Sequence, residues 1–356
     1  MAGHIALPEY VRYFNPNATK KELLMPATLN KYILTDLLRG KMGFNGLVVT
    51  DASHMVAMTS AMKRSEMLPT AIAAGSDMFL FFNDPEEDFE WMMEGYRKGI
   101  ITDERLEEAL TRILGTKAAL GLHKKAKTEI LPEKEVAMAK IGLEENKAIA
   151  KEVSDKAITL VKNTQDVLPI APEKTKRVLL VEAKGFDGGF GKFIEIMGGA
   201  KKKPIEIVKE LLEAKGFDVE IWESPIDKIM KLPKEEMAQA LGNVYAGKRP
   251  IAELTSKYDL IINIANVNAS VDQRLQWPPS KGTPDIPFYV NEIPTIFVSV
   301  KCPFHLADVP QVKTYINTYD DNQQTLEALV EKLVGNSEFK GISPVDAFCG
   351  FGDTRF

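Results

Sequence analysis

Short apolar runs and amphipathic segments alternate over the first third of the chain. The run Leu47-Val48-Val49 is continuous and partly β-branched, which is typical of a strand buried on both faces of a parallel sheet. Apolar residues at helical spacing precede it, a second helical segment ends at Gly75, and the segment 76–82 is again strand-like. This succession predicts a β/α architecture for residues 1–122, in which chemistry is expected at the carboxyl ends of the strands.

Two further helices and then a change of composition follow. Residues 84–99 have the apolar spacing of an amphipathic helix, and Thr102 is an N-cap candidate for the next one. Residues 123–135 are charged and have no clear period. We therefore predict that the segment 123–156 is a linker that ends in a helix of roughly 140–156.

The remaining residues, 157–356, have the pattern of a second α/β domain. Strand-like apolar runs are separated by helical segments at 204–215 and 324–334. This interleaving predicts an open, mostly parallel sheet in a three-layer α/β sandwich. The predicted strands are 157–163, 177–182, 218–222, 260–265, 295–300 and 312–316.

Composition narrows the class of protein. The chain has 356 residues, 45% of them hydrophobic and 27% charged, which is the balance of a soluble globular protein of about two domains. The net charge of −5 argues against a nucleic-acid or anionic-membrane partner, and no apolar run is long enough to span a bilayer. Cys302 and Cys349 lack metal-ligand spacing, and the N-terminus lacks the pattern of a signal peptide. We expect a cytoplasmic protein with free thiols, no metal and no cofactor.

Asp51 is the first candidate for a catalytic residue. It ends the apolar run at 47–49, so a rigid strand would hold its carboxylate at the edge of the sheet where ligands bind. An aspartate that only caps a helix or a loop is common at such a place. Spacing alone leaves both interpretations open.

The sequence around Asp51 resembles a known family. The succession Met25-Pro-Ala-Thr-Leu, Gly43-Phe-Asn-Gly-Leu-Val-Val-Thr-Asp51 and Ala73-Ala-Gly-Ser-Asp77 is similar to the last part of the catalytic barrel of glycoside hydrolase family 3. The resemblance implies that residues 1–122 are the C-terminal portion of a (β/α)8 barrel and that Asp51 is its nucleophile. Asn45 departs from the acidic residue usual at its position, and the segment 157–163 with later motifs resembles the α/β domain that follows the barrel in this family.

The same resemblance implies an activity. The continuation Ala52-Ser53-His54-Met55 is similar to the β-N-acetylhexosaminidase branch, which implies a retaining hydrolase that removes β-linked N-acetylglucosamine by double displacement. Small glycosides or cell-wall-derived saccharides are then the expected partners. A partial barrel would also leave sheet edges exposed, which favours a homo-oligomer. Rival interpretations are a β-glucosidase and a catalytically inactive fragment that serves as a binding or oligomerisation module.

One part of the family's pattern has no counterpart in this sequence. A whole barrel needs about 250 residues, and the acid/base loop of the family, a Lys-His-Phe-Pro-Gly-His-like segment, does not occur here. In order along the chain, the last three barrel strands would end near His4, Asp51 and Phe82. We expect this chain alone to hydrolyse aryl N-acetylglucosaminides slowly or not at all, because an unassisted leaving group loses about 10²–10⁴ in rate.

Other polar and aromatic residues are weaker candidates. His4, His54 and Met55 are candidate substrate-binding residues, and His54 is also a candidate replacement for the acid. Asp77 opens a strand at the end far from the expected mouth, so we predict a structural role for it. The glycine-rich segment 186–191 matches no phosphate-binding motif. Three further residues, Arg274, Gln276 and Trp277, would suit either a sugar or an interdomain contact.

Overall fold

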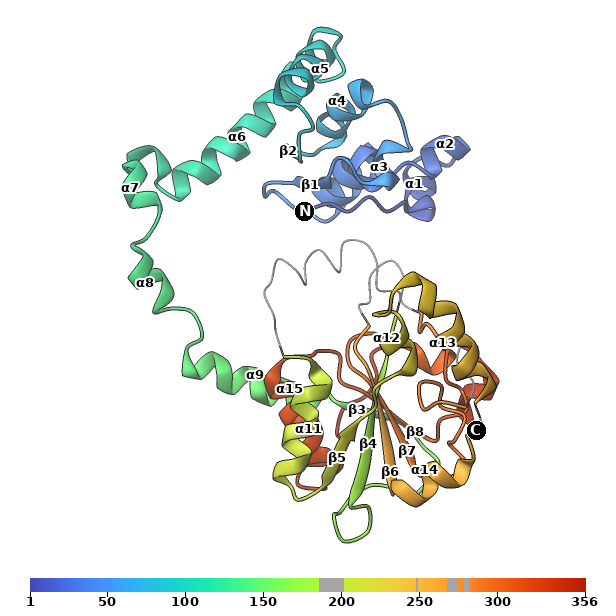
Figure 1. The fold of residues 1–356 in the computed structure, drawn as a ribbon. Coiled ribbons are helices and arrows are strands. Elements are labelled where there is room, and N and C mark those ends of the chain that lie inside the picture. Colours follow the sequence, from blue (N-terminus) through green and yellow to red (C-terminus); the bar gives the residue numbers. More distant parts are fainter. Residues whose placement is uncertain (186–201, 248, 268–273, 278–281) are drawn as a thin grey trace. The chain divides into compact units, whose positions relative to one another are not determined.

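A computed structural model describes residues 1–185, 202–247, 249–267, 274–277 and 282–356. The chain forms two compact units, Met1–Met138 and Ala139–Phe356, each of which mixes helices with parallel strands (Figure 1). The division falls inside the segment 123–156 that the sequence predicts as a linker.

The first unit, Met1–Met138, is built mainly from helices around a small sheet. Its elements, in chain order, are α1 (Pro8–Phe14), α2 (Lys20–Leu23), η1 (Ala27–Leu29), η2 (Tyr32–Lys41), β1 (Val49–Ala52), α3 (Val56–Thr59), α4 (Arg64–Ala74), β2 (Met78–Leu80), α5 (Pro85–Arg97), α6 (Asp103–Ala119), η3 (Leu122–Lys124), α7 (Lys127–Ile130) and α8 (Lys134–Met138).

Three parallel segments form the small sheet. β1 pairs with β2, and Ala2 forms a parallel bridge with Thr50 on the other side of β1. The two expected strands are present, but β1 begins at Val49, near the end of the apolar run 47–49, and β2 is shorter than the predicted segment 76–82. Val48, just before β1, is buried, and the half-exposed residues around it show that this sheet is only partly covered within the unit.

Helices α4 and α5 approach each other closely at one glycine. A Cβ atom added at Gly95 of α5 would lie 2.2 Å from the Cβ of Pro69 in α4, which is far inside van der Waals contact. Gly95 is buried in α5 and Pro69 is buried in α4. The absence of a side chain at this position therefore sets the packing of α4 on α5.

Gly95→Ala is expected to lower the free energy of unfolding of the first unit by about 1–3 kcal/mol, because it overpacks this contact. Gly115→Ala in α6 is the matched control, since nothing lies within 4 Å of a Cβ built there. The control should gain up to about 1 kcal/mol from helix propensity alone. Hydrogen exchange in α4 and α5 measures both changes, and equal effects of the two substitutions would contradict the close approach.

The second unit, Ala139–Phe356, contains a six-stranded sheet in the order β3-β8-β7-β6-β4-β5. All its neighbouring strands are parallel except β3, which pairs antiparallel with β8. The elements are α9 (Glu144–Ala157), β3 (Thr159–Asn163), β4 (Arg177–Ala183), α11 (Pro204–Ala214), β5 (Asp218–Ile221), α12 (Pro225–Ile229), α13 (Lys234–Ala246), α14 (Ile251–Lys257), β6 (Leu260–Ala265), β7 (Thr295–Ser299), η4 (His305–Ala307), β8 (Thr314–Asn317), α15 (Gln323–Leu333) and η5 (Gly352–Arg355).

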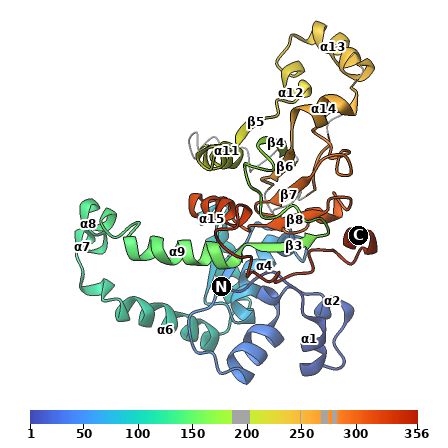
Figure 2. The same cartoon turned by 90° about the horizontal axis from the view of Figure 1, so that it is seen from below.

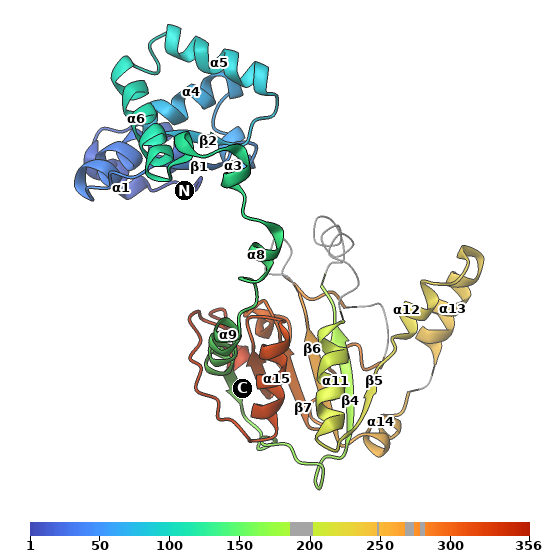
Figure 3. The ribbon, with the colours of Figure 1, turned by 90° about the vertical axis from the view of Figure 1, so that its left-hand side faces the viewer.

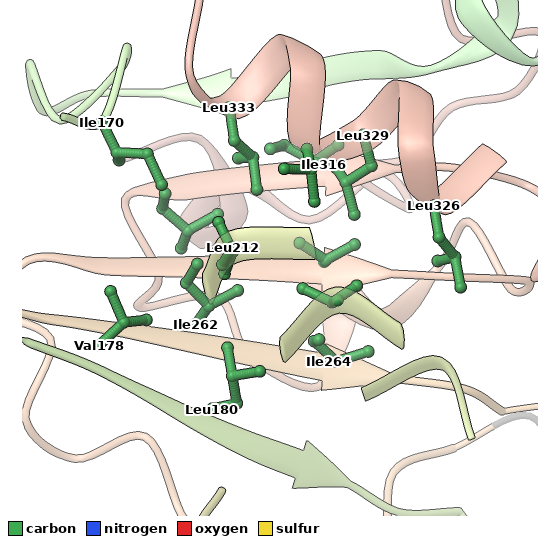
Figure 4. Packing of buried hydrophobic residues seen from close by; sticks show 14 of the residues in the cluster. Ile170, Val178, Leu180, Leu212, Ile262, Ile264, Ile316, Leu326, Leu329 and Leu333 are labelled. Atoms are coloured by element: carbon green, nitrogen blue, oxygen red, sulfur yellow. The ribbon is translucent and has the colours of Figure 1, made fainter. Parts of the chain in front are cut away.

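The main core of the second unit lies between this sheet and helices on one face. Helices α11 and α15 cover that face, and α9 packs against α15 (Figures 2 and 3). Leu212 of α11 and Leu329 of α15 meet Leu180, Ile262 and Ile316 of the strands (Figure 4). Twenty buried residues form this cluster, against five in the largest cluster of the first unit. Hydrophobic burial, at about 1.5–3 kcal/mol per large side chain, therefore stabilises the second unit far more.

Two regions differ from the sequence prediction. The segment between β5 and β6 contains three helices, α12, α13 and α14, that the sequence pattern does not predict. Helix α13 has no buried residue, so its apolar period is weak. The charged stretch 123–135, predicted as part of a linker, contains short helical turns, and the helix expected at 140–156 is α9, which begins later.

Candidate active site

Asp51 lies in β1, one residue before the strand ends. Its own amide donates to the carbonyl of Ala2 at 2.9 Å, so the backbone at this point is held by the neighbouring parallel segment. One carboxylate oxygen, Oδ1, accepts the amide of Ala52 at 2.7 Å. The side chain is half-exposed, and no other described residue donates to the carboxylate. The second oxygen is thus available to a ligand within this unit.

His4 contacts the end of β1 rather than open solvent. Its Nε2 lies 3.0 Å from the carbonyl oxygen of Ala52, and its Nδ1 lies 2.8 Å from Oγ1 of Thr28. Thr28 is completely buried in η1, so the ring is fixed between two elements. The predicted role of His4 in binding substrate has no support in these contacts, since both ring nitrogens are already engaged.

The loop after Asp51 is tied to the end of β2. Ser53 is fully buried, and its hydroxyl donates to the carbonyl of Phe81 while its amide donates to the carbonyl of Leu80. Thr50 contributes a further link, because its Oγ1 accepts the amide of Leu80 at 3.0 Å. The two strand ends therefore form one rigid edge, with Asp51 on it.

An ion pair between α4 and α5 supports the segment that follows β2. Arg64 of α4 binds Asp88 of α5 through two nitrogens, at 2.8 and 2.6 Å, and also contacts the carbonyl of Phe81 at 3.3 Å. Burial acts to raise the pKa of Asp88, but the hydrogen bonds from Arg64 and from the Asn83 amide hold this pKa below its usual value. The carboxylate is therefore ionised at neutral pH and keeps Arg64 in place.

His54 and Met55 lie on the surface of the loop after β1. The ring of His54 is exposed and stacks on Phe81, with ring centroids 6.2 Å apart and planes at 28°. Met55 is 43% exposed. No described hydrogen bond joins His54 to the Asp51 carboxylate, so the two do not form a paired acid and nucleophile in this state. His54 and Met55 remain candidates for contact with a sugar.

Asp77 lies at the opposite end of the small sheet, as its position before β2 predicts. Its side chain is completely buried and its Oδ2 accepts from Arg39 at 2.8 Å and from the Val48 amide at 2.9 Å. Arg105 and Arg112 contact the other oxygen. One carboxylate thus holds three arginines from η2 and α6, which is a structural role.

Asn45, the departure from the family motif, belongs to this same cluster. Its side-chain oxygen lies 3.4 Å from a nitrogen of Arg112. An amide oxygen occupies the position where a carboxylate would give the arginines a further negative charge. Asn45 therefore takes part in the support of the fold through Arg112.

The candidates in the second unit are engaged within that unit. Arg274 pairs with Asp308, whose other oxygen accepts the Leu275 amide at 3.1 Å. Trp277 packs against the apolar cluster that contains Leu275. Arg274 and Trp277 thus have partners within the second unit, and their contact with a sugar stays a prediction. The glycine-rich segment 186–191 lies outside the described residues.

Several residues of the site were missed by sequence reasoning. Thr28, Ser53, Arg64 and Phe81 all take part in fixing the two strand ends. The only signal in the sequence was the apolar pair Phe81-Phe82 that continues beyond β2; both rings are more than half exposed. Within the described residues, no His, Cys, Asp and Glu side chains group as metal ligands, and no helix has the length and apolar character needed to cross a bilayer.

Comparison with known proteins relates the first unit to a family model and the whole chain to longer relatives. Residues 1–116 match the model of the glycosyl hydrolase family 3 N terminal domain. A protein of Cellulomonas fimi, a beta-N-acetylglucosaminidase/beta-glucosidase, is 39% identical over 359 residues, which is 100% of this chain and 58% of that protein. The chain therefore spans 58% of the length of this relative.

Solved structures give the same relationship. Beta-glucoside phosphorylase BglX matches with a TM-score of 0.82 and 39% identity, over 100% of this chain and 58% of that chain. A second structure of that phosphorylase, bound to 2FGlc, has a TM-score of 0.81. A family 3 beta-N-acetylglucosaminidase from Paenibacillus sp. str. FPU-7 has a TM-score of 0.61 at 23% identity, over 89% of this chain and 54% of that chain, which concerns the fold alone. Together these matches support glycoside hydrolase family 3 for this chain.

Proposed function

We propose, from this support for glycoside hydrolase family 3, that Asp51 is the nucleophile of a retaining glycosidase. The observation that carries the proposal is the placement of Asp51: a rigid strand end holds it, and one carboxylate oxygen has no donor among the described residues. A nucleophilic carboxylate needs this combination of fixed position and one open side.

The reaction proposed is a double displacement. An oxygen of Asp51 attacks the anomeric carbon, the glycosidic bond breaks, and the leaving group departs as an alkoxide or phenoxide that takes a proton. The resulting glycosyl ester is then attacked by an acceptor, which loses a proton as the bond to Asp51 breaks. Each step inverts the anomeric centre, so the product keeps the β configuration.

The proposed substrates are β-linked N-acetylglucosaminides. This choice is supported by the Ala52-Ser53-His54-Met55 segment and by the name of the Cellulomonas fimi relative, which covers both N-acetylglucosaminidase and β-glucosidase. The proposal assigns no acid/base among the described residues, because no described hydrogen bond joins Asp51 to a side chain that could serve as its paired acid. Aryl glycosides with good leaving groups bypass the need for an acid, since the phenoxide leaves without a proton.

A second candidate function is transfer of the sugar to phosphate. It is favoured by the 39% identity, over the full length of this chain, to a β-glucoside phosphorylase. In that case phosphate, in place of water, attacks the glycosyl ester. The two functions are told apart by the product formed in phosphate buffer, which is a sugar 1-phosphate for transfer and a reducing sugar for hydrolysis.

Trapping of the glycosyl ester tests the proposal. We expect a 2,4-dinitrophenyl 2-deoxy-2-fluoro-β-glucoside, or 5-fluoro-N-acetylglucosaminyl fluoride, to add one sugar to this chain, because fluorine slows the second step more than the activated first step. Intact mass and peptide mapping should place the label on the peptide that contains Asp51. The relative extent of labelling by the two reagents gives the preferred sugar, and a label on any other carboxylate would refute the assignment.

A further inference from the structure

We propose that His4 is a positioning residue that sets the orientation of Asp51 through the backbone of Ala52 and makes no contact with the sugar. The inference rests on the proposed function of Asp51. It concerns a residue that the sequence alone presents as a substrate ligand.

The contacts of His4 determine its tautomer. A carbonyl oxygen only accepts hydrogen bonds, so Nε2, at 3.0 Å from the Ala52 carbonyl, carries the proton. In the neutral ring Nδ1 is then the acceptor, and the hydroxyl of Thr28 donates to it at 2.8 Å. Neither ring nitrogen is left to bind a sugar hydroxyl.

The peptide that His4 holds is the one that contacts the carboxylate. The carbonyl of Ala52 accepts from His4, and the amide of Ala52 donates to Oδ1 of Asp51 at 2.7 Å. Two residues before His4, Ala2 accepts the amide of Asp51 at 2.9 Å. One short segment, 2–4, therefore fixes the backbone on both sides of the carboxylate.

The anchor on the other side of the ring is rigid. Thr28 is completely buried, and its neighbours Ala27 and Leu29 belong to apolar clusters of the first unit. A ring fixed between this turn and the strand end limits rotation of the Ala52 peptide. Misplacement of a reacting group by about 1 Å costs on the order of 10²-fold in rate, so such a restraint has a measurable effect.

Three variants separate positioning from sugar binding. His4→Phe keeps an aromatic ring and removes both hydrogen bonds, His4→Gln keeps a donor near the position of Nε2, and Thr28→Val removes only the anchoring hydroxyl. We expect His4→Phe to slow labelling of Asp51 by the activated fluoro sugar by about 10–100-fold. His4→Gln should restore most of the rate, and Thr28→Val should lie between them.

The affinity for the free monosaccharide would change in these variants if His4 contacted the sugar. Its dissociation constant, measured by calorimetry, should be the same for wild type and all three variants. A weaker affinity with an unchanged labelling rate would overturn the proposal, as would full activity of both His4→Phe and Thr28→Val. If His4→Phe does not fold, the near-isosteric Thr28→Val variant decides the question.

Nitrogen NMR of histidine-labelled protein tests the contact without any reaction. The chain has four histidines, so the signal of His4 can be assigned by comparison with His4→Gln. We expect the neutral tautomer with the proton on Nε2. In Thr28→Val, which lacks the hydroxyl that donates to Nδ1, we expect the ring to exchange between its two neutral tautomers. The opposite tautomer would overturn the inference, whereas absence of labelling in wild type with the expected tautomer would count against the proposed function alone.

Discussion

Replacing Asp51 by asparagine is expected to reduce turnover of a dinitrophenyl glycoside by at least about 10³-fold, because the variant cannot form the glycosyl ester. Asp36→Asn is the matched control: Asp36 is a half-exposed aspartate of η2 in the same unit, and the substitution removes the same charge. Initial rates of phenolate release measure both. Equal rates for the two variants would contradict the role of Asp51.

Azide adds a stereochemical test of the same prediction. In wild type, azide needs no general base and intercepts the glycosyl ester, so two inversions give the β-glycosyl azide. In Asp51→Gly, azide enters the space left by the carboxylate and displaces the phenolate directly, so one inversion gives the α-glycosyl azide. A β product from the glycine variant would show that another residue is the nucleophile.

The strands of the second unit were the most predictable part of the fold. Leu260–Ala265 and Thr295–Ser299 are predominantly apolar segments that are buried along their whole length, and the structure places both at the centre of the parallel sheet. A short, mainly apolar segment without alternation is typical of a strand that is buried on both faces of a parallel sheet. The pattern therefore predicts these strands with only small errors at their ends.

The helices between β5 and β6 illustrate the opposite case. Helix α13 has no buried residue and α14 none either, so neither has the strong apolar stripe that marks a helix in a sequence. Helix α13 contacts α12, and Ile251 and Leu254 of α14 pack against the cluster that contains Tyr258. Such contacts are not readable from the segment itself.

In the candidate site, too, local sequence patterns predict some features and not others. The position of Asp51 follows from a local pattern, an apolar run that ends in a carboxylate. The partners that fix it do not, because Thr28 lies 24 residues from His4 and Ala52 lies 48 residues from it. The local pattern therefore locates the nucleophile candidate, whereas the contacts of His4 with Thr28 and Ala52 could be found only in the folded structure.

The arginine cluster around Asp77 gives the largest expected effect on stability. Arg39 and Arg105 have side chains that are only 10% exposed, and burial lowers the pKa of Arg39 while Asp77 partly offsets this. Removing one partner of a buried ion pair leaves uncompensated charge and typically costs about 3–5 kcal/mol. That is comparable with the whole stability of a small domain.

Asp77→Asn is therefore expected to unfold the first unit, or to lower its free energy of unfolding by about 3–5 kcal/mol, and to leave the second unit folded. Glu108→Gln is the matched control, because Glu108 pairs with the same Arg105 but is 54% exposed, and such a pair contributes less than about 1 kcal/mol. Hydrogen exchange separates the two units: protection should collapse in β1 and β2 and persist in β4 and β6. A loss as small as that of the control would mean that the three arginines are held by their packing and not by the carboxylate. In that case the side chains of η2 and α6, rather than Asp77, would be the support on which the Asp51 edge depends.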